Sequence, residues 1–261
     1  SGKHPLAYER ENKLDDYKNM LKDGLGKIAE TFIGKPIWVR TSDIRSDEYS
    51  NLEGAPKEIE RNPMLGDHGI RFSLKHEGIL KAELMACKEL ADKGHKFGIM
   101  FPQIISVEEV MKAKAIFRDL EINNVQFGVM IETPAASLLI NEICDFISFE
   151  TNDLTQYTHA IYRGNEEVQN IYDETNPAVL KQLESVIKVC KEKGVESSIC
   201  GQAGSKPEMV EHLVKFGIDS ISVNADACKT ISELAQKLET DMQIEPIDNK
   251  EDIAEEIEET K

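Results

Sequence analysis

The chain has 261 residues, of which 30% are charged and 40% apolar, a balance typical of one barrel-type α/β domain with a substantial core. It contains no apolar run long enough to cross a bilayer and no signal-peptide pattern, so we expect a cytoplasmic protein without membrane contacts. The formal net charge of −17 would repel nucleic-acid phosphates, which excludes nucleic acid as a partner and requires any anionic ligand to be bound by local donors.

The first part of the chain alternates between helical and strand patterns. Apolar residues at helical spacing predict helices over 14–32 and 80–91, and a glycine follows each of them. Short apolar runs predict buried strands over 37–39 and 97–101. The first of these strands leads directly into a polar run that begins with Arg40, which is typical of a functional loop.

The middle of the chain continues the same alternation. Ser106 and Glu109 form the sequence pattern of a capping box, which predicts the start of a further helix. The runs 125–131 and 146–149 predict two more strands. Each run is apolar almost throughout, as expected where helices cover a parallel sheet.

The last third of the chain supplies the remaining elements. In chain order they are a helix from Asn176 to Gly194, a strand ending at Cys200, a helix capped by Ser205 and Glu208, a strand over 220–223 and a helix around 231–238. We expect one α/β domain over residues 1–243. The acidic segment 244–261 is expected to be a disordered tail.

Six strand–helix units imply right-handed crossovers and a parallel sheet. The sheet is either closed into a barrel or open and doubly wound, and the pattern alone does not distinguish the two. In both cases functional side chains lie at the carboxyl ends of the strands. The polar residues expected at that edge are Arg40, Glu132, Asn152, Asp153 and Cys200.

Two carboxylates are candidates for metal ligands. Glu132 ends one predicted strand and Asp153 follows the next, so that both could bind one Mg²⁺ or Mn²⁺ ion, which accepts one or two protein carboxylates together with water and substrate oxygens. The alternative is that Glu132 and Asp153 merely cap the helices that begin near Pro134 and Leu154. Both interpretations remain open at this point.

Two arginines are candidates for anion binding. Arg40 at a strand end could bind a phosphate or carboxylate with two parallel hydrogen bonds, or it could form a surface ion pair with Asp43. Arg163 has the same two interpretations, and it lies in a loop whose path the sequence does not define.

Five cysteines occur singly, without a C-x-x-C pair, which fits a reducing compartment and argues against a structural zinc site. Cys200 lies where a strand turns through small residues towards a helix. A thiol near a helix N-terminus and a cation could have a lowered pKa and act as a nucleophile or acid. The alternative is a buried structural cysteine.

Several segments together resemble one known family. They are RTSD at 40–43, NPMLG at 62–66, GVMIE at 128–132, TNDLTQ at 151–156 and ICGQ at 199–202. In this order they resemble the phosphoenolpyruvate-utilising enzymes: phosphoenolpyruvate (PEP) synthase, pyruvate phosphate dikinase and enzyme I of the sugar phosphotransferase system. The run 217–222 is most similar to the synthase branch, and the resemblance extends from about Gly2 to about Asp226.

The resemblance implies a TIM-type (β/α) barrel within a larger phosphotransferase that binds PEP or pyruvate with Mg²⁺, or with Mn²⁺. By this resemblance Glu132 and Asp153 are the metal ligands and Cys200 transfers a proton to or from the three-carbon ligand. The residues implied in substrate binding are Arg40, Glu132, Thr151, Asn152, Asp153, Arg163 and Gly201. The implied partners are a phosphohistidine domain and a nucleotide-binding domain.

Some positions depart from the family pattern. His68 stands where an arginine is usual, Glu150 where glycine is common and Tyr162 where aspartate is frequent. The segment that would hold a first phosphate-binding arginine and the first two barrel strands would precede Ser1. We therefore expect a barrel without its first two strands, whose exposed sheet edges favour homo-oligomers. These departures also allow an alternative function, a non-catalytic homologue that senses a ligand or associates with proteins.

Overall fold

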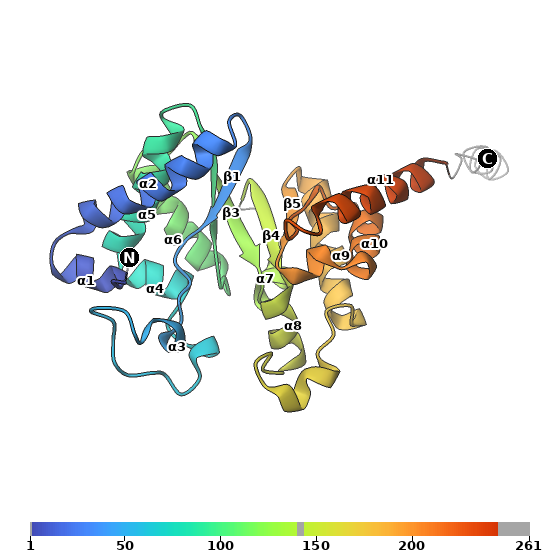
Figure 1. Cartoon of the computed structure of the whole chain (residues 1–261), viewed down its shortest axis with the longest axis horizontal. Coiled ribbons are helices and arrows are strands. Elements are labelled where there is room, and N and C mark those ends of the chain that lie inside the picture. Colours follow the sequence, from blue (N-terminus) through green and yellow to red (C-terminus); the bar gives the residue numbers. More distant parts are fainter. Residues whose placement is uncertain (1, 140–143, 245–261) are drawn as a thin grey trace, which may run out of the picture.

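The computed structural model describes residues 2–139 and 144–244, and they form six parallel strands with helices between them. The strands are β1 (Pro36–Arg40), β2 (Lys96–Phe101), β3 (Val125–Ile131), β4 (Phe146–Glu150), β5 (Glu196–Cys200) and β6 (Ser220–Ile221). Their order in the sheet is the order in the sequence, from β1 to β6. Figure 1 shows an open, curled sheet, so that the architecture is a half-barrel and the doubly wound alternative does not apply.

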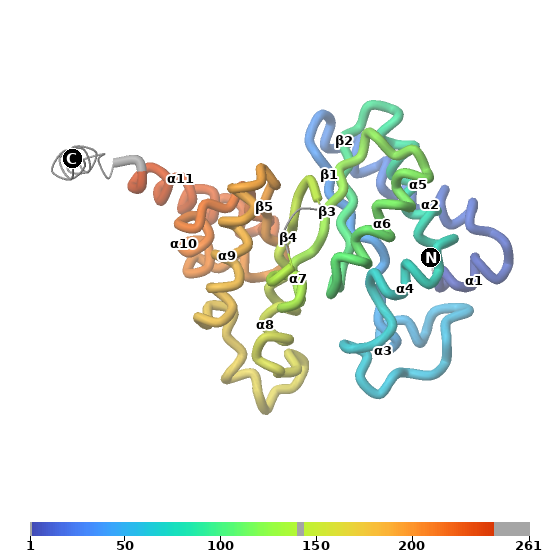
Figure 2. The backbone as a smooth tube through the Cα atoms, turned by 180° about the vertical axis from the view of Figure 1, so that it is seen from behind, coloured from blue at the N-terminus to red at the C-terminus, as the bar shows by residue number. Residues whose placement is uncertain are grey.

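Two of the described helices precede the first strand, and the others lie between and after the strands. They are α1 (Pro5–Arg10), α2 (Leu14–Thr31), α3 (Ser46–Tyr49), α4 (Ile70–Lys75), α5 (Glu77–Ala91), α6 (Val107–Asp119), α7 (Pro134–Leu139), α8 (Thr151–His159), α9 (Pro177–Lys193), α10 (Pro207–Phe216) and α11 (Cys228–Ile244). Short 3₁₀ turns span Pro63–Leu65, Glu166–Ile171 and Gln202–Ser205. Figures 1 and 2 place α2, α5 and α6 beside the first strands and α9, α10 and α11 beside the last ones.

The two faces of the sheet differ in composition because successive strand residues point to opposite sides. The odd-numbered residues of the strands face the helices, and nearly all of them are apolar. Ile99, Val129 and Phe149, for example, share one buried cluster with helix residues such as Leu84 and Val186. Burial of this continuous apolar face against the helices supplies the main stabilisation of the fold.

The opposite face is filled by few large side chains. The Phe146 ring is fully buried and stacks on Trp38, with ring centroids 4.0 Å apart. A Cβ atom at Gly98 would lie 2.7 Å from this ring, and a Cβ atom at Gly128 would also overlap it. The two glycines therefore provide the space that Phe146 occupies on the inner side of the sheet.

The start and end of most helices agree with the sequence. Ser106 and Glu109 form the expected capping box, Asn176 caps α9 and Gly194 ends it in the left-handed conformation. The prediction that Ser205 and Glu208 form a capping box is wrong. Lys206 precedes α10 instead, and the hydroxyl of Ser205 accepts a hydrogen bond from the backbone N–H of Asn224 at 3.0 Å.

The C-terminal segment 245–261, which contains nearly all of the predicted acidic tail, lies outside the described residues. The final strand is shorter than expected, because β6 covers only residues 220–221. Within the part of the chain that the structure describes, no helix is both long and apolar enough to span a bilayer.

Candidate active site at the carboxyl edge of the sheet

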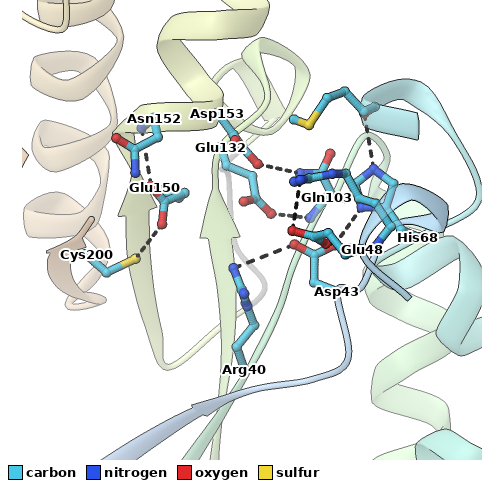
Figure 3. A network of polar contacts seen from close by, with 12 residues as sticks. Arg40, Asp43, Glu48, His68, Gln103, Glu132, Glu150, Asn152, Asp153 and Cys200 are labelled. Atoms are coloured by element: carbon cyan, nitrogen blue, oxygen red, sulfur yellow. Dashed lines mark hydrogen bonds and ion pairs between the residues drawn. The ribbon is translucent and has the colours of Figure 1, made fainter. Parts of the chain in front are cut away.

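The predicted site residues gather at one edge of the half-barrel. Arg40 ends β1, Glu132 follows β3, Asp153 lies in the first turn of α8 and Cys200 ends β5. Figure 3 shows these four side chains, with Asn152, around the same carboxyl edge. The convergence follows from the fold, since parallel strands that are neighbours in sequence bring their carboxyl ends together.

Glu132 and Asp153 are joined through Gln103, which lies two residues beyond the end of β2. The backbone N–H of Gln103 donates a short hydrogen bond to Glu132 Oε1, and its side-chain amide donates to Asp153 Oδ2 at 3.3 Å. Glu132 is fully buried and Asp153 is 6% exposed. Burial, together with the negative charges of Asp43 and Asp153, raises the pKa of Glu132 well above its ordinary value.

The capping alternative for these two carboxylates does not hold. The side chain that accepts from the first turn of α7 belongs to Thr133, whose hydroxyl binds the backbone N–H of Ala136 at 3.0 Å. At α8 the capping side chain is Glu150, which accepts from the backbone N–H of Asn152 at 3.3 Å. Glu132 and Asp153 therefore do not serve as caps of these helices.

The donor set fits a hard divalent cation. Glu132 Oε2 and Asp153 Oδ1 are buried oxygens without a hydrogen-bond partner among the described residues, although Asp153 Oδ1 lies 3.3 Å from Arg163 Nη1. Within residues 2–139 and 144–244 there is no cluster of three or more His, Cys, Asp or Glu side chains suited to a metal. Two carboxylates are enough for Mg²⁺, which keeps several water or substrate ligands.

A group of charged residues at the end of β1 forms the second part of the site. Arg40 Nη1 lies 3.6 Å from Asp43 Oδ2, which is the ion pair considered as the alternative for Arg40. The guanidinium carries five N–H donors and 43% of the Arg40 side chain is exposed, so an anionic ligand can approach it. Asp43 also binds His68, which is only 2% exposed.

Arg163 lies closer to the site than its loop position indicated. Its backbone N–H donates to the side chain of Gln156 at 2.9 Å, and its guanidinium forms the ion pair with Asp153. Burial raises the pKa of Asp153, and the nearby charge of Arg163 opposes that increase. Arg163 thus contributes positive charge next to a buried carboxylate.

Cys200 and Glu150 are direct neighbours on β5 and β4. The thiol lies 3.3 Å from the backbone oxygen of Phe149 and 3.6 Å from Glu150 Oε2. Burial and the charge of Glu150 raise the pKa of Cys200 to about 12. The expectation of a lowered pKa was wrong, because the thiol is largely buried and the charge beside it is a carboxylate.

Thr151 and Gly201, which the family resemblance places at the substrate, have different surroundings. Thr151 is fully buried and its hydroxyl donates to Glu174 at 2.9 Å. Gly201 has a φ of +88°, and a Cβ atom there would lie 2.6 Å from Glu150 Oε1. Gly201 therefore borders the site, whereas the side chain of Thr151 is used to anchor α8.

Sequence reasoning missed Gln103 and underestimated Asp43. Gln103 has a φ of +59°, which turns both its backbone N–H and its side chain towards the two carboxylates. Its position two residues beyond β2 was the available signal, because the other site residues also lie at or just beyond the carboxyl ends of their strands. Asp43 had been considered only as an ion-pair partner of Arg40.

The six described strands form an open, curled parallel sheet, with carboxylates, arginines and a thiol at its carboxyl edge. This arrangement is that of the TIM-type α/β barrel domains. Residues 4–240 match the family described as PEP-utilising enzyme, PEP-binding domain. The chain belongs to this family, which confirms the resemblance found in the sequence.

Relatives with curated names agree with this assignment. The chain is 50% identical over 245 residues to a probable phosphoenolpyruvate synthase of Archaeoglobus fulgidus, covering 91% of this chain and 32% of that protein. It is 36% identical over 226 residues to a phosphoenolpyruvate-protein phosphotransferase of Latilactobacillus sakei, covering 82% of this chain and 39% of that protein. The chain therefore spans about a third of the length of these relatives.

Among solved structures, an HpcH/HpaI aldolase/citrate lyase family protein of Burkholderia cenocepacia matches with a TM-score of 0.43 at 15% identity. The match covers 85% of this chain and 90% of that one.

Proposed function

We propose that this chain is the PEP- or pyruvate-binding domain of a PEP synthase-like phosphotransferase, with Glu132 and Asp153 as ligands of Mg²⁺, or of Mn²⁺. One observation carries the proposal: Glu132 and Asp153 are buried and both contact Gln103 at the carboxyl edge, and Glu132 Oε2 has no hydrogen-bond partner among the described residues. A buried carboxylate without compensation is costly, and a bound cation would remove that cost.

The remaining residues divide the binding of a small anionic ligand among them. Arg40 and Arg163 would attract the phosphoryl and carboxylate oxygens, because both guanidinium groups lie at this edge beside acidic partners. Asn152 would hold a phosphoryl oxygen. When bound, the metal ion would neutralise negative charge on the enolate oxygen. Cys200 would exchange a proton with the methyl carbon of pyruvate, which is the methylene carbon of PEP.

A domain of this kind needs partners to complete a phosphotransfer. The family membership supports partners that carry a phosphohistidine and a nucleotide-binding site, either in the same enzyme or on a separate chain. On its own, this chain is expected to bind ligands without forming PEP from ATP.

Titration calorimetry with oxalate, a mimic of the pyruvate enolate, tests the proposal. We expect heat of binding only when Mg²⁺ is present, and we expect Asp153→Ala to abolish it. Asp119→Asn, at the last residue of α6 where 69% of the side chain is exposed, removes a similar charge and should leave binding unchanged. Equal binding with and without Mg²⁺, or full binding by Asp153→Ala, would contradict the proposed metal site.

A second function is favoured by His68 and Glu150, which occupy positions where the family usually has arginine and glycine. Under this alternative the chain is a non-catalytic homologue that senses a ligand or associates with proteins. Failure to bind oxalate or PEP in the presence of Mg²⁺ would support protein association, whereas metal-dependent binding supports the proposed PEP site.

A further inference from the structure

Glu150 occupies an unusual place between the thiol and the start of α8. One carboxylate oxygen, Oε1, accepts from the backbone N–H of Asn152 at 3.3 Å, while Oε2 lies 3.6 Å from Cys200 Sγ (Figure 3). Glu150 and Cys200 are paired in the register of β4 and β5, so that both side chains emerge on the same face of the sheet. The contact is therefore built into the strand pairing.

The backbone around Glu150 leaves room for this arrangement. A Cβ atom at Gly201 would lie 2.6 Å from Glu150 Oε1, and Gly201 adopts a φ of +88° that favours glycine. A side chain at position 201 would displace the carboxylate. The capping hydrogen bond to Asn152 holds it from the other side.

Several charged groups face the pair from the surrounding elements. Arg40 on β1 and Arg163 after α8 are positive, whereas Glu132 after β3 and Asp153 on α8 are negative. Burial, followed by the charge of Asp153, raises the pKa of Glu150, and the two arginines oppose the increase. For the thiol, burial and Glu150 act in the same direction and raise its pKa to about 12.

We propose that Glu150 is a positioning residue that acts through Cys200, holding the sulfur as a thiol in the resting site so that Cys200 is ready to give a proton to the enolate carbon. This inference rests on the proposed function. In the step, the S–H bond breaks and a C–H bond forms with the electron pair of the enolate double bond, which restores the ketone of pyruvate. The thiolate then recovers a proton from water.

The pH profile of alkylation at Cys200 tests this coupling without ligand or metal. The rate of reaction with iodoacetamide is followed by mass spectrometry of the Cys200 peptide in the unmodified chain and in Glu150→Gln. The glutamine keeps an oxygen for the backbone N–H of Asn152 but removes the charge. We expect the profile to move to lower pH, with a rate about tenfold higher at a given alkaline pH, because thiolate increases tenfold for each unit by which the thiol pKa falls.

Two controls belong to the same experiment. Glu196→Gln removes a carboxylate at the other end of β5 and should leave the Cys200 profile in place. Cys190, whose pKa is also raised to about 12 but by burial and Asp219, should keep its own profile in Glu150→Gln.

The shape of the profile separates the possible outcomes. A loosened fold would increase the alkylation rate by one factor at all pH values, whereas loss of the charge shifts the profile along the pH axis. An unchanged profile, a shift to higher pH or a uniform increase overturns the inference. Since oxalate and Mg²⁺ are absent, this result is independent of the calorimetric test of the proposed function.

Discussion

The Nδ1 atom of His68 lies 2.7 Å from Asp43 Oδ1, while the Nε2 atom of the same ring lies 3.1 Å from the backbone oxygen of Met64. Both ring nitrogens therefore face acceptors, and an imidazole that donates from both is protonated. Burial lowers the pKa of His68, but the hydrogen bond to Asp43 and its charge outweigh burial, and the pKa lies above its ordinary value. The contacts of both ring nitrogens thus favour the positively charged form of His68.

The protonated His68 should make stability depend on pH. Because its pKa is raised in the folded state, its contribution is complete below the unfolded-state value of about 6.5 and is lost as the pH rises through the folded-state value. We expect His68→Gln to lower the free energy of unfolding by about 2 kcal/mol at acidic pH and by less at alkaline pH. Urea unfolding of both proteins at about pH 6 and about pH 9 measures the difference. The same loss at both pH values would show that the ring is neutral.

Removal of the charge of Glu132 should stabilise the metal-free protein. The side chain is fully buried, one of its oxygens has no hydrogen-bond partner within the described ranges, and Asp43 and Asp153 lie close enough to repel it. Glu132→Gln keeps an oxygen to accept from Gln103 and should raise the free energy of unfolding by about 1–3 kcal/mol without Mg²⁺.

The same variant should lose the stabilisation that Mg²⁺ gives to the unmodified chain, since binding to the native state alone stabilises it. Thermal unfolding with and without Mg²⁺ measures both effects. If Glu132→Gln were less stable than the unmodified chain in the absence of metal, the carboxylate would be a structural group.

The space around Phe146 makes a prediction about packing. Gly128→Ala should destabilise the fold by about 1–3 kcal/mol, because the new methyl group overlaps the buried Phe146 ring. Gly24→Ala, in α2 where a Cβ atom meets nothing within 4 Å, should instead be neutral or stabilising. Phe146→Leu should recover part of the loss in a double variant with Gly128→Ala. Additive losses in the double variant would show that the ring is not the obstacle.

The open edges of the sheet predict self-association. Among the described strands, β1 pairs only with β2 and β6 only with β5, and Ile33, three residues before β1, is 81% exposed. We expect light scattering to detect oligomers of this chain and Ile33→Lys to reduce them. Met111→Lys, on α6 away from both edges, serves as the control. A monomer at all concentrations would contradict this prediction.

Most of the fold could be predicted because its strands are apolar almost throughout and its helices carry clear start and stop residues. The choice between a half-barrel and a doubly wound sheet could not be made. That choice depends on which strands are neighbours, and the apolar pattern of a strand does not reveal its neighbour. The Ser205 capping box failed for a similar reason, since the hydroxyl is used by Asn224, a tertiary partner nineteen positions away.

The site was predictable where polar residues directly follow apolar strands, as for Arg40 and Glu132. It was not predictable where a role depends on backbone geometry or on a neighbouring charge. Gln103 contributes through its own N–H group in a left-handed conformation. Burial and then the charge of Glu150 raise the pKa of Cys200, and Glu150 is adjacent because β4 and β5 pair.

Strand order in this sheet repeats the order of the chain, and within residues 2–139 and 144–244 each strand is hydrogen-bonded only to the strands before and after it. Each strand after β1 therefore pairs with the strand that precedes it in the chain, and no existing strand pair has to separate to admit it. A unit added or lost at either margin leaves the register of the inner strands intact. The residues of the candidate site therefore lie along this edge in chain order, from Arg40 on β1 to Cys200 on β5.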